Sequence, residues 1–410
     1  MKDQIVSVRK AKARPWPIRL YNLLPAGSLD FDDLIRTARR KEKLEDFGPG
    51  DFEEPLRRLL QSINEEARLH AFGRMITRIR LINILRNRLR SQYFFKKYPD
   101  ILAQDSPPII LITGLQRTGT TKLHRLLAAH DAIRALHSWE ALNPAPFLPE
   151  GSSSQRRIKE ARTSERALKY IASDFFAIHP VEHDAPEEEV LLLDNSFIST
   201  VPEATMHVPT FASWVEKQDQ SPAYEMMLRL IKLLHWQSPA PFWLLKSPHH
   251  LEFLGDVFNT FPDVKVIHTH RAPELTLASF CSMVYHSRRI FSDQVSAEEV
   301  GKHWSRKVNR MLQRAMDFRE KEASAQFLDI YYENLLQKPL DQLEAIYKFR
   351  DIPFLRIEQE KAELLLKRNQ QHKYGVHRYA LEDFGLREEE IKNNFTTYYQ
   401  RFLNSVNKHD

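Results

Sequence analysis

The fold is decided by one stretch of sequence, Ile109-Ile110-Leu111-Ile112-Thr113-Gly114-Leu115-Gln116-Arg117-Thr118-Gly119-Thr120-Thr121. It opens with a short apolar, β-branched run after two prolines, which is typical of a buried strand. A loop with two glycines follows, and then a helical pattern with Leu123, Leu126 and Leu127 on one face. Strand, glycine loop and helix in this order predict the opening of a phosphate-binding α/β domain.

Three more strand candidates lie downstream, at residues 242–245, 264–268 and 327–331. Each precedes a segment with a helical pattern, and this alternation predicts a series of βαβ units with a parallel sheet. The predicted fold class is α/β, with a P-loop-like parallel sheet flanked by helices. A helical N-terminal region and a helical insertion complete it.

Residues 1–105 form the predicted helical N-terminal region, and residues 106–410 the main domain. In the first region Leu56, Leu60, Ile63 and Ala67 follow a period of about 3.6 residues, which is typical of an amphipathic helix. In the main domain we expect a mostly helical insertion over about 140–240. It contains the loop-like acidic segment His183-Asp184-Ala185-Pro186-Glu187-Glu188-Glu189.

The composition is that of an ordinary globular protein, with 60 basic and 54 acidic residues and a net charge of +6. So small a surplus does not indicate a nucleic-acid-binding protein and suits an anionic small-molecule ligand. The single cysteine, Cys281, excludes an internal disulfide and is consistent with a reducing compartment. We expect no transmembrane segment and no secretory signal, and therefore a cytoplasmic location. The oligomeric state is left open.

The loop has the outer frame of a P-loop, since four residues separate Gly114 from Gly119. Backbone N–H groups of such a loop, with the helix that follows, form a cradle for an anion. A nucleoside triphosphatase needs a lysine where this chain has Thr120, and Arg117 is the only strong cation inside the loop. The loop is therefore predicted to bind a phosphate without the parts that transfer a γ-phosphoryl group.

This combination resembles the phosphate loop of the sulfotransferase superfamily, in which a cation precedes Gly-Thr-Thr. The superfamily uses 3′-phosphoadenosine-5′-phosphosulfate (PAPS) as its sulfonyl donor. The resemblance covers residues from about 109 to the C-terminus and is nearest to the bacterial family, with a motif similar to that of tyrosylprotein sulfotransferases. It implies that the donor is bound by Arg117, Thr118, Gly119, Thr120 and Thr121.

Two further segments carry the same resemblance. Arg271 follows a predicted strand and Ser279 comes eight residues later, the spacing at which the superfamily binds the 3′-phosphate. Lys246 ends an earlier strand 25 residues before Arg271, where the family has a lysine that contacts the bridging oxygen or the sulfonate. All of these lie at the carboxyl ends of predicted strands, the edge at which open parallel sheets bind ligands.

The resemblance is less specific near the adenine. Tyr332, in Tyr331-Tyr332-Glu333-Asn334, matches a segment that lies against the base in the superfamily. Arg378 lies in a late segment that is similar to the bacterial family, and it is a possible second contact to the nucleotide. One departure is Lys122, because many cytosolic members have an aromatic residue directly after the Thr-Thr pair.

Sulfonyl transfer needs cations on the leaving group and a base for the proton of the acceptor. Arg117 and Lys246 are the predicted cations. By resemblance to the tyrosylprotein type, Glu140 is the first candidate for the base. By resemblance to the cytosolic type, His249 is the second, and the choice between them stays open.

The predicted function is transfer of a sulfonyl group from PAPS to an acceptor hydroxyl or amine, with release of 3′-phosphoadenosine-5′-phosphate (PAP). No metal is required. The acceptor, a small molecule, lipid or carbohydrate, is not identified by the sequence. The alternatives are a P-loop nucleotide kinase, which would need Mg²⁺, and a non-catalytic PAP-binding protein.

Overall fold

The central sheet has five parallel strands in the order β3-β4-β2-β5-β6. The computed structural model describes residues 5–6, 13–149, 154–322, 324–368 and 376–404. The strands are β2 (Ile109–Gly114), β3 (Ile133–Ala135), β4 (Phe242–Lys246), β5 (Val264–His270) and β6 (Phe327–Tyr331). The four predicted strands and the α/β fold class are confirmed. The edge strand β3 was not predicted, because three residues with an arginine in the middle are too short for a periodicity signal.

Both faces of the sheet are covered, since alternate residues of each strand point to opposite sides. Ile109 and Leu111 of β2 pack into a large apolar cluster with the N-terminal helices and with the helices from α13 (Ser221–Gln237) to α16 (Ala297–Lys321). Ile110 and Ile112 pack on the other side against α6 (Thr120–Leu127) and the helices from α17 (Tyr332–Gln337) to α19 (Arg356–Arg368). The five-stranded sheet therefore lies inside the molecule, with its phosphate-loop strand β2 buried along its length.

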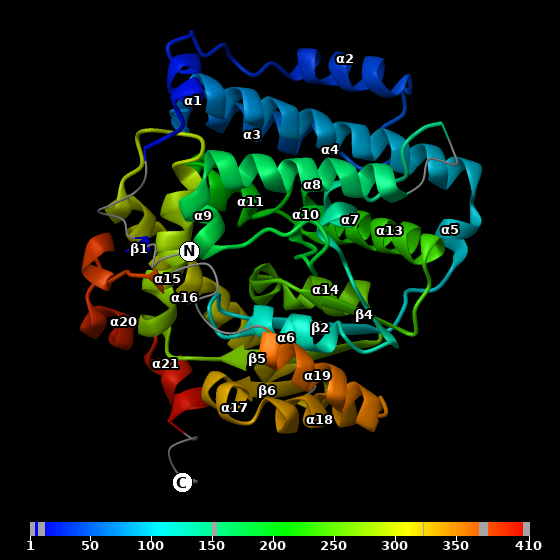
Figure 1. Cartoon of the computed structure of the whole chain (residues 1–410), viewed down its shortest axis with the longest axis vertical. Helices are drawn as coiled ribbons and strands as arrows, with labels where there is room; N and C mark the ends of the chain where they lie inside the picture. Colours follow the sequence, from blue (N-terminus) through cyan, green and yellow to red (C-terminus); the bar gives the residue numbers. More distant parts are fainter. Residues whose placement is uncertain (1–4, 7–12, 150–153, 323, 369–375, 405–410) are drawn as a thin grey trace.

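The predicted N-terminal helical region is present and packs over the sheet domain (Figure 1). Leu56, Leu60, Ile63 and Ala67 are buried, as their period predicts. The large apolar cluster includes residues of both predicted regions, from Leu29 to Phe402. The division at residue 105 stays a prediction. The helices are α1 (Trp16–Tyr21), α2 (Phe31–Glu42), α3 (Glu53–Glu66), α4 (Ala71–Lys97) and α5 (Asp100–Ala103).

The chain between β2 and β4 is mostly helical, as predicted, and the acidic segment 183–189 contains no helix or strand. The helices between β2 and β4 are, in chain order, α6 (Thr120–Leu127), α7 (Ser138–Leu142), α8 (Ser154–Ile171), α9 (Ser173–Ile178), α10 (Val190–Leu193), η2 (Asp194–Ser196), α11 (Val201–Thr205), α12 (Pro209–Val215) and α13 (Ser221–Gln237).

The helices after β4 cover the rest of the sheet, and α17 to α19 lie along its lower side in Figure 1. They are η3 (Pro248–Glu252), α14 (Leu254–Thr260), α15 (Pro273–Arg288), α16 (Ala297–Lys321), η4 (Ser324–Gln326), α17 (Tyr332–Gln337), α18 (Pro339–Phe349), α19 (Arg356–Arg368), η5 (Leu381–Phe384), α20 (Glu388–Asn394), α21 (Thr396–Tyr398) and the π turn η6 (Tyr399–Leu403). A small parallel pair joins β1 (Ile5–Val6) to β7 (Val376–His377). None of the described helices has the length and apolar composition needed to cross a membrane.

Candidate active site

The phosphate loop, residues 114–121, connects the central strand β2 to α6 at the carboxyl edge of the sheet. Gly114 has a φ of 149°, and a Cβ there would lie 2.1 Å from the Thr269 Oγ1 of β5. Gly119 caps α6 with a φ of 88°. The Thr118 hydroxyl donates to the Leu115 carbonyl at 2.6 Å and is buried. The loop is thus held closely against its neighbours, and its backbone conformation requires the two glycines.

Arg117 is the exposed cation of this loop and has a positive φ of 71°. A non-glycine residue in the left-handed region is uncommon and occurs most often at turns and functional sites. Thr120 is buried at the start of α6, whereas Thr121 is exposed. The structure therefore leaves the Arg117 side chain and the first turn of α6 beside the loop, where an anion would bind.

Arg271 follows the end of β5 and reaches back to the phosphate loop. Its Nη1 donates to the Arg117 carbonyl at 2.9 Å, and its guanidinium lies 3.9 Å from the centre of the Tyr332 ring. That ring also approaches Gly119, since a Cβ there would lie 3.2 Å from Tyr332 Cδ2. The structure brings Arg271 and Tyr332 together at the loop, and the guanidinium covers one face of the ring.

Ser279 lies on α15, the helix that begins two residues after Arg271. Its hydroxyl is buried and has no hydrogen-bond partner among the described residues, and the same is true of Arg271 Nε. Buried polar groups normally have partners. Both groups are therefore free to donate to an anionic ligand.

Lys246 ends β4 and is almost fully buried, with a side chain that is 6% exposed. Its Nζ lies 2.5 Å from Glu188 Oε1, and its backbone N–H donates to Glu189 Oε2 at 2.7 Å. Glu189 Oε1 lies 2.6 Å from His250 Nε2, and His250 Nδ1 lies 2.7 Å from the Tyr224 hydroxyl. The acidic segment is therefore attached directly to the end of β4.

His179, the C-terminal cap of α9, belongs to the same region. Burial lowers its pKa, Glu187 and Glu188 oppose that shift, and Lys246 and Arg117 add to it. The pKa of His179 thus responds to the two carboxylates of the acidic segment and to both predicted cations of the site.

Glu140 lies in different surroundings. Its Oε1 is 2.5 Å from Nη2 of Arg134, and its Oε2 accepts the His137 backbone N–H at 3.1 Å as the capping box of α7. The carboxylate is buried, and Arg134 pairs in the sheet with Trp243, three residues before Lys246. Both oxygens therefore have structural partners. That Glu140 is the base stays a prediction.

His249 is buried at the start of η3, with Nδ1 3.2 Å from the Thr200 hydroxyl. Its Nε2 has no partner among the described residues. Burial, and then the charges of His250 and Lys307, lower its pKa well below the usual value, so the ring is neutral. Its part in proton transfer also stays a prediction. Arg378 is exposed after β7, and no described contact joins it to the phosphate loop.

His268, His270 and Asp329 offer potential metal-ligand atoms within 4.8 Å of one another. A positive side chain already lies among them, because Nη1 of Arg319 is 2.7 Å from Asp329 and 3.0 Å from His268. Burial acts to raise the pKa of Asp329, but hydrogen bonds from His270 and Arg319 outweigh burial and hold this pKa below its usual range. These contacts describe a buried charge network that supports β5 and β6, and a cation would compete with Arg319 for the same oxygens.

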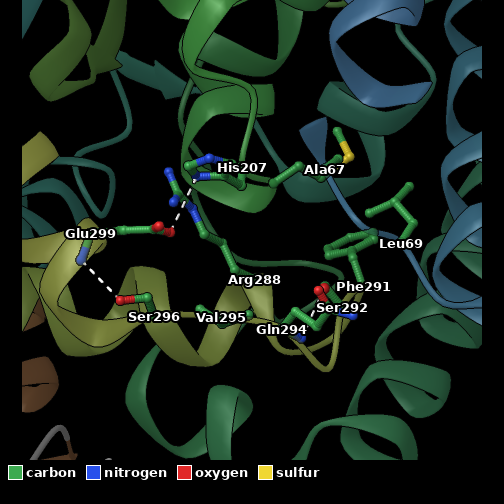
Figure 2. A pocket seen from close by; sticks show the side chains of 11 residues that line it. Ala67, Leu69, His207, Arg288, Phe291, Ser292, Gln294, Val295, Ser296 and Glu299 are labelled. Atoms are coloured by element: carbon green, nitrogen blue, oxygen red, sulfur yellow. Dashed lines mark hydrogen bonds and ion pairs between the residues drawn. The ribbon is translucent and has the colours of Figure 1, made fainter. Parts of the chain in front are cut away.

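A cavity away from the phosphate loop lies between the start of α4 and the connection from α15 to α16. Its lining includes Leu69, His207, Arg288, Phe291 and Glu299 (Figure 2). None of the predicted donor-binding residues lines it. Ser292 also pairs with Leu69 across an isolated bridge at this junction. The cavity is therefore part of the contact between the N-terminal helices and the main domain.

Arg271 contacts the loop that carries Arg117, and Lys246 ends the adjacent strand β4 at the same edge of the sheet. This arrangement defines an α/β protein with a P-loop-like fold. The model of the sulfotransferase family matches residues 108–356. The chain belongs to this family, and it is an enzyme whose reaction is sulfonyl transfer. No curated protein sequence matches the chain.

Two solved structures are similar to the chain along most of its length. The sulfotransferase STF1 from Mycobacterium tuberculosis H37Rv is 31% identical, with a TM-score of 0.80. The similarity covers 91% of this chain and 100% of that one. The sulfotransferase STF9 from Mycobacterium avium is 22% identical, with a TM-score of 0.82 and coverage of 92% and 98%. The fold over both the N-terminal helices and the sheet is thus that of bacterial sulfotransferases.

The sequence analysis missed the contact of the acidic segment with Lys246. A run of three glutamates is not a specific signal, because the chain has a second one at residues 388–390. Glu188 lies 58 residues before Lys246, and no local pattern indicates which strand end it contacts. Only the packing of the insertion identifies the partner.

Proposed function

We propose that this chain is a PAPS-dependent sulfotransferase, which transfers the sulfonyl group to an acceptor hydroxyl or amine and releases PAP. The observation that carries the proposal is the phosphate loop with Thr120 in place of the P-loop lysine and with Arg271 in contact with it. The Ser279 hydroxyl on the helix after Arg271, which has no hydrogen-bond partner among the described residues, adds to it. A loop without that lysine is poorly suited to a γ-phosphate. A second phosphate site at β5 and α15 is the feature that separates a 3′-phosphorylated nucleotide from ATP.

In this proposal the loop N–H groups, Arg117, Thr118, Gly119, Thr120 and Thr121 hold the 5′ phosphate and sulfonate. Arg271 and Ser279 bind the 3′-phosphate, and Tyr332 lies beside the adenine, with Arg378 as a possible further contact. Charge grows on the leaving phosphate oxygen as the sulfur–oxygen bond breaks. Arg117 and Lys246 then stabilise that charge from the ends of two adjacent strands.

The proposed chemistry uses no metal, because Lys246 and Arg117 supply the positive charge. We also place the reaction in the cytoplasm, since the one cysteine, Cys281, is buried and unpaired as a thiol. The acceptor is a small molecule, lipid or carbohydrate. Its pocket is formed at least in part by the insertion that follows α7.

Thermal unfolding with PAP, ATP and GTP, each with Mg²⁺ or with EDTA, tests the proposal. PAP at about 100 times its Kd should stabilise the fold by about 2.7 kcal/mol whether or not Mg²⁺ is present. ATP and GTP should stabilise it less. Stabilisation by ATP that requires Mg²⁺ would instead favour a nucleotide kinase. PAP binding without turnover of PAPS by any acceptor in a broad panel would favour a non-catalytic PAP-binding protein.

A further inference from the structure

One carboxylate of the site is neither buried among structural partners nor used by the mechanism above. Glu188 Oε1 lies 2.5 Å from Lys246 Nζ, and its Oε2 lies 3.4 Å from the Ser247 hydroxyl. The Glu188 side chain is 22% exposed, whereas that of Lys246 is 6% exposed. Among the described residues, Glu188 is the only carboxylate paired with the Lys246 ammonium. It therefore lies where the sulfonate is proposed to bind.

The backbone around Glu188 is held firmly. Its neighbour Glu189 accepts the Lys246 backbone N–H and contacts His250, and it is fully buried. On the other side, the Glu187 backbone N–H donates to the Leu136 carbonyl at 2.7 Å. The Ser138 N–H donates to Ala185 at 3.0 Å. Because both flanks are fixed to β4 and to the chain before α7, the Glu188 side chain is directed at one place.

We propose that Glu188 is the base of the reaction, and that donor binding releases it from Lys246. The inference rests on the proposed function. An ammonium that is drawn to the leaving phosphate no longer neutralises its carboxylate, and a carboxylate without its counter-ion accepts a proton more readily. The ion pair in the free enzyme thus keeps the base inactive until the donor is present.

The proposed step moves one sulfonyl group and one proton. The acceptor oxygen forms a bond to sulfur, and the bond between sulfur and the 5′-phosphate oxygen breaks. The electron pair of that bond leaves with PAP, where Lys246 and Arg117 stabilise it. The proton of the acceptor passes to Glu188 and from there to solvent, since the side chain is partly exposed.

The other candidates have weaker geometry for this step. Both oxygens of Glu140 have partners, Arg134 and the His137 N–H, and its side chain is 4% exposed. His249 is 3% exposed and packs against Phe253, with a ring separation of 4.9 Å. Neither contacts Lys246. A base must come within hydrogen-bond reach of the proton that it removes, and partial exposure beside the sulfonate lysine favours Glu188.

The test is Glu188→Gln, measured by calorimetric titration with PAP and by transfer from radiolabelled PAPS to two acceptors. Removing the charge that competes for Lys246 should tighten PAP binding by about two- to tenfold. With an aliphatic alcohol, kcat should fall by about 10²–10⁴-fold. With p-nitrophenol, which ionises readily without a base, kcat should fall much less. A structural defect would reduce transfer to both acceptors equally.

The matched control is Glu182→Gln, which removes another carboxylate of the same stretch. Glu182 is paired with Arg125 of α6 at 2.6 Å, and both side chains are about a quarter exposed. We expect PAP affinity and kcat of this variant to remain within about twofold of the wild type. Glu140→Gln is assayed in parallel, because Glu140 is the base predicted from the sequence.

Three results would overturn the inference. PAP binding by Glu188→Gln that is unchanged or weaker shows that Glu188 does not compete for Lys246, and this measurement needs no acceptor. Equal kcat losses with both acceptors show that Glu188 is structural. If Glu140→Gln is inactive while Glu188→Gln is active, Glu140 is the base and Glu188 is not. A wild-type protein that does not bind PAP contradicts the proposed function instead, so the two failures are distinguishable.

Discussion

At the scale of single residues, Arg271 connects several parts of the candidate site. Its guanidinium contacts the phosphate loop through the Arg117 carbonyl and covers the Tyr332 ring. One side chain thus joins the end of β5 to the loop and to the start of α17. Its Nε has no hydrogen-bond partner among the described residues, so Arg271 can donate to a phosphate while it keeps these contacts.

The first prediction is that Arg271→Ala weakens PAP binding by about 10- to 100-fold, the loss expected for a charge-assisted hydrogen bond. Binding of 5′-AMP, which lacks the 3′-phosphate, should weaken by less than about threefold. Calorimetric titration measures both constants. Arg356→Ala, which removes an arginine 92% exposed on α19, is the control and should change neither. If AMP and PAP lose affinity equally, Arg271 does not recognise the 3′-phosphate.

At the scale of elements, the start of α4 depends on a neutral histidine. His70 Nδ1 accepts the Gly73 backbone N–H at 2.8 Å, which caps the helix. Burial, and then the charge of Arg14, lower the pKa of His70 to about 4. A protonated imidazole has no free nitrogen to accept this hydrogen bond, so charging His70 removes the cap.

The second prediction follows from the sign of this shift. The folded pKa lies below the ordinary value of 6.5, so the unfolded chain takes up the proton first as the pH falls. The contribution of His70 is complete above pH 6.5 and is lost as the pH falls toward 4. Within this window the slope for one such group is at most about 1.4 kcal/mol per pH unit.

His70→Asn keeps an acceptor at the cap position without a titrating group. The free energy of unfolding, measured by urea titration across the window, should therefore fall less steeply with decreasing pH in this variant. Part of the slope should remain, because burial also lowers the pKa of His286 to about 4. His137→Asn, at a side chain 40% exposed, is the control. A slope identical in His70→Asn and the wild type would contradict the assignment.

At the scale of the whole molecule, buried charges connect the insertion to the helices behind the sheet. Lys307 of α16 is fully buried and lies 2.8 Å from Glu252 of η3 and 3.0 Å from Glu216 at the end of α12. Glu203 of α11 is 3.8 Å away. Burial acts to lower the pKa of Lys307, but attraction to the three glutamates outweighs burial and raises this pKa. One ammonium thus pairs with carboxylates from three separate elements, and Arg306 and Arg310 pair with two of the same glutamates.

The third prediction is that Lys307→Met destabilises the fold by about 3–5 kcal/mol, because it leaves buried carboxylates without their counter-charge. Urea unfolding measures the loss. Lys302→Met, at an exposed position on the same helix, should change stability by less than about 0.5 kcal/mol. A triple change of Lys307 and two of its glutamates to apolar residues should recover part of the loss. A small effect of Lys307→Met alone would show that water, or Arg310, which also pairs with Glu252, compensates the lost charge.

The parallel sheet and the phosphate loop can be predicted from local sequence patterns. Strands such as Ile109–Gly114 are buried on both faces, so they appear as continuous apolar runs between turns. The loop is local as well, since Gly114, Arg117 and Gly119 lie within six residues. Carboxyl ends of adjacent parallel strands share one edge, and the sequence alone therefore predicts that Lys246 and Arg271 lie near the loop.

Which carboxylate faces that edge depends on long-range packing. Glu140 and Glu188 are both acidic residues of the insertion, and no local pattern distinguishes them. The short strand β3 and the capping box of α7 bury Glu140 against Arg134, whereas Glu189 fixes its neighbour Glu188 beside Lys246. The partners are 58 residues apart, so their contact depends on how the whole insertion packs. The residue type sets the charge of a side chain, but the fold sets which group that side chain contacts.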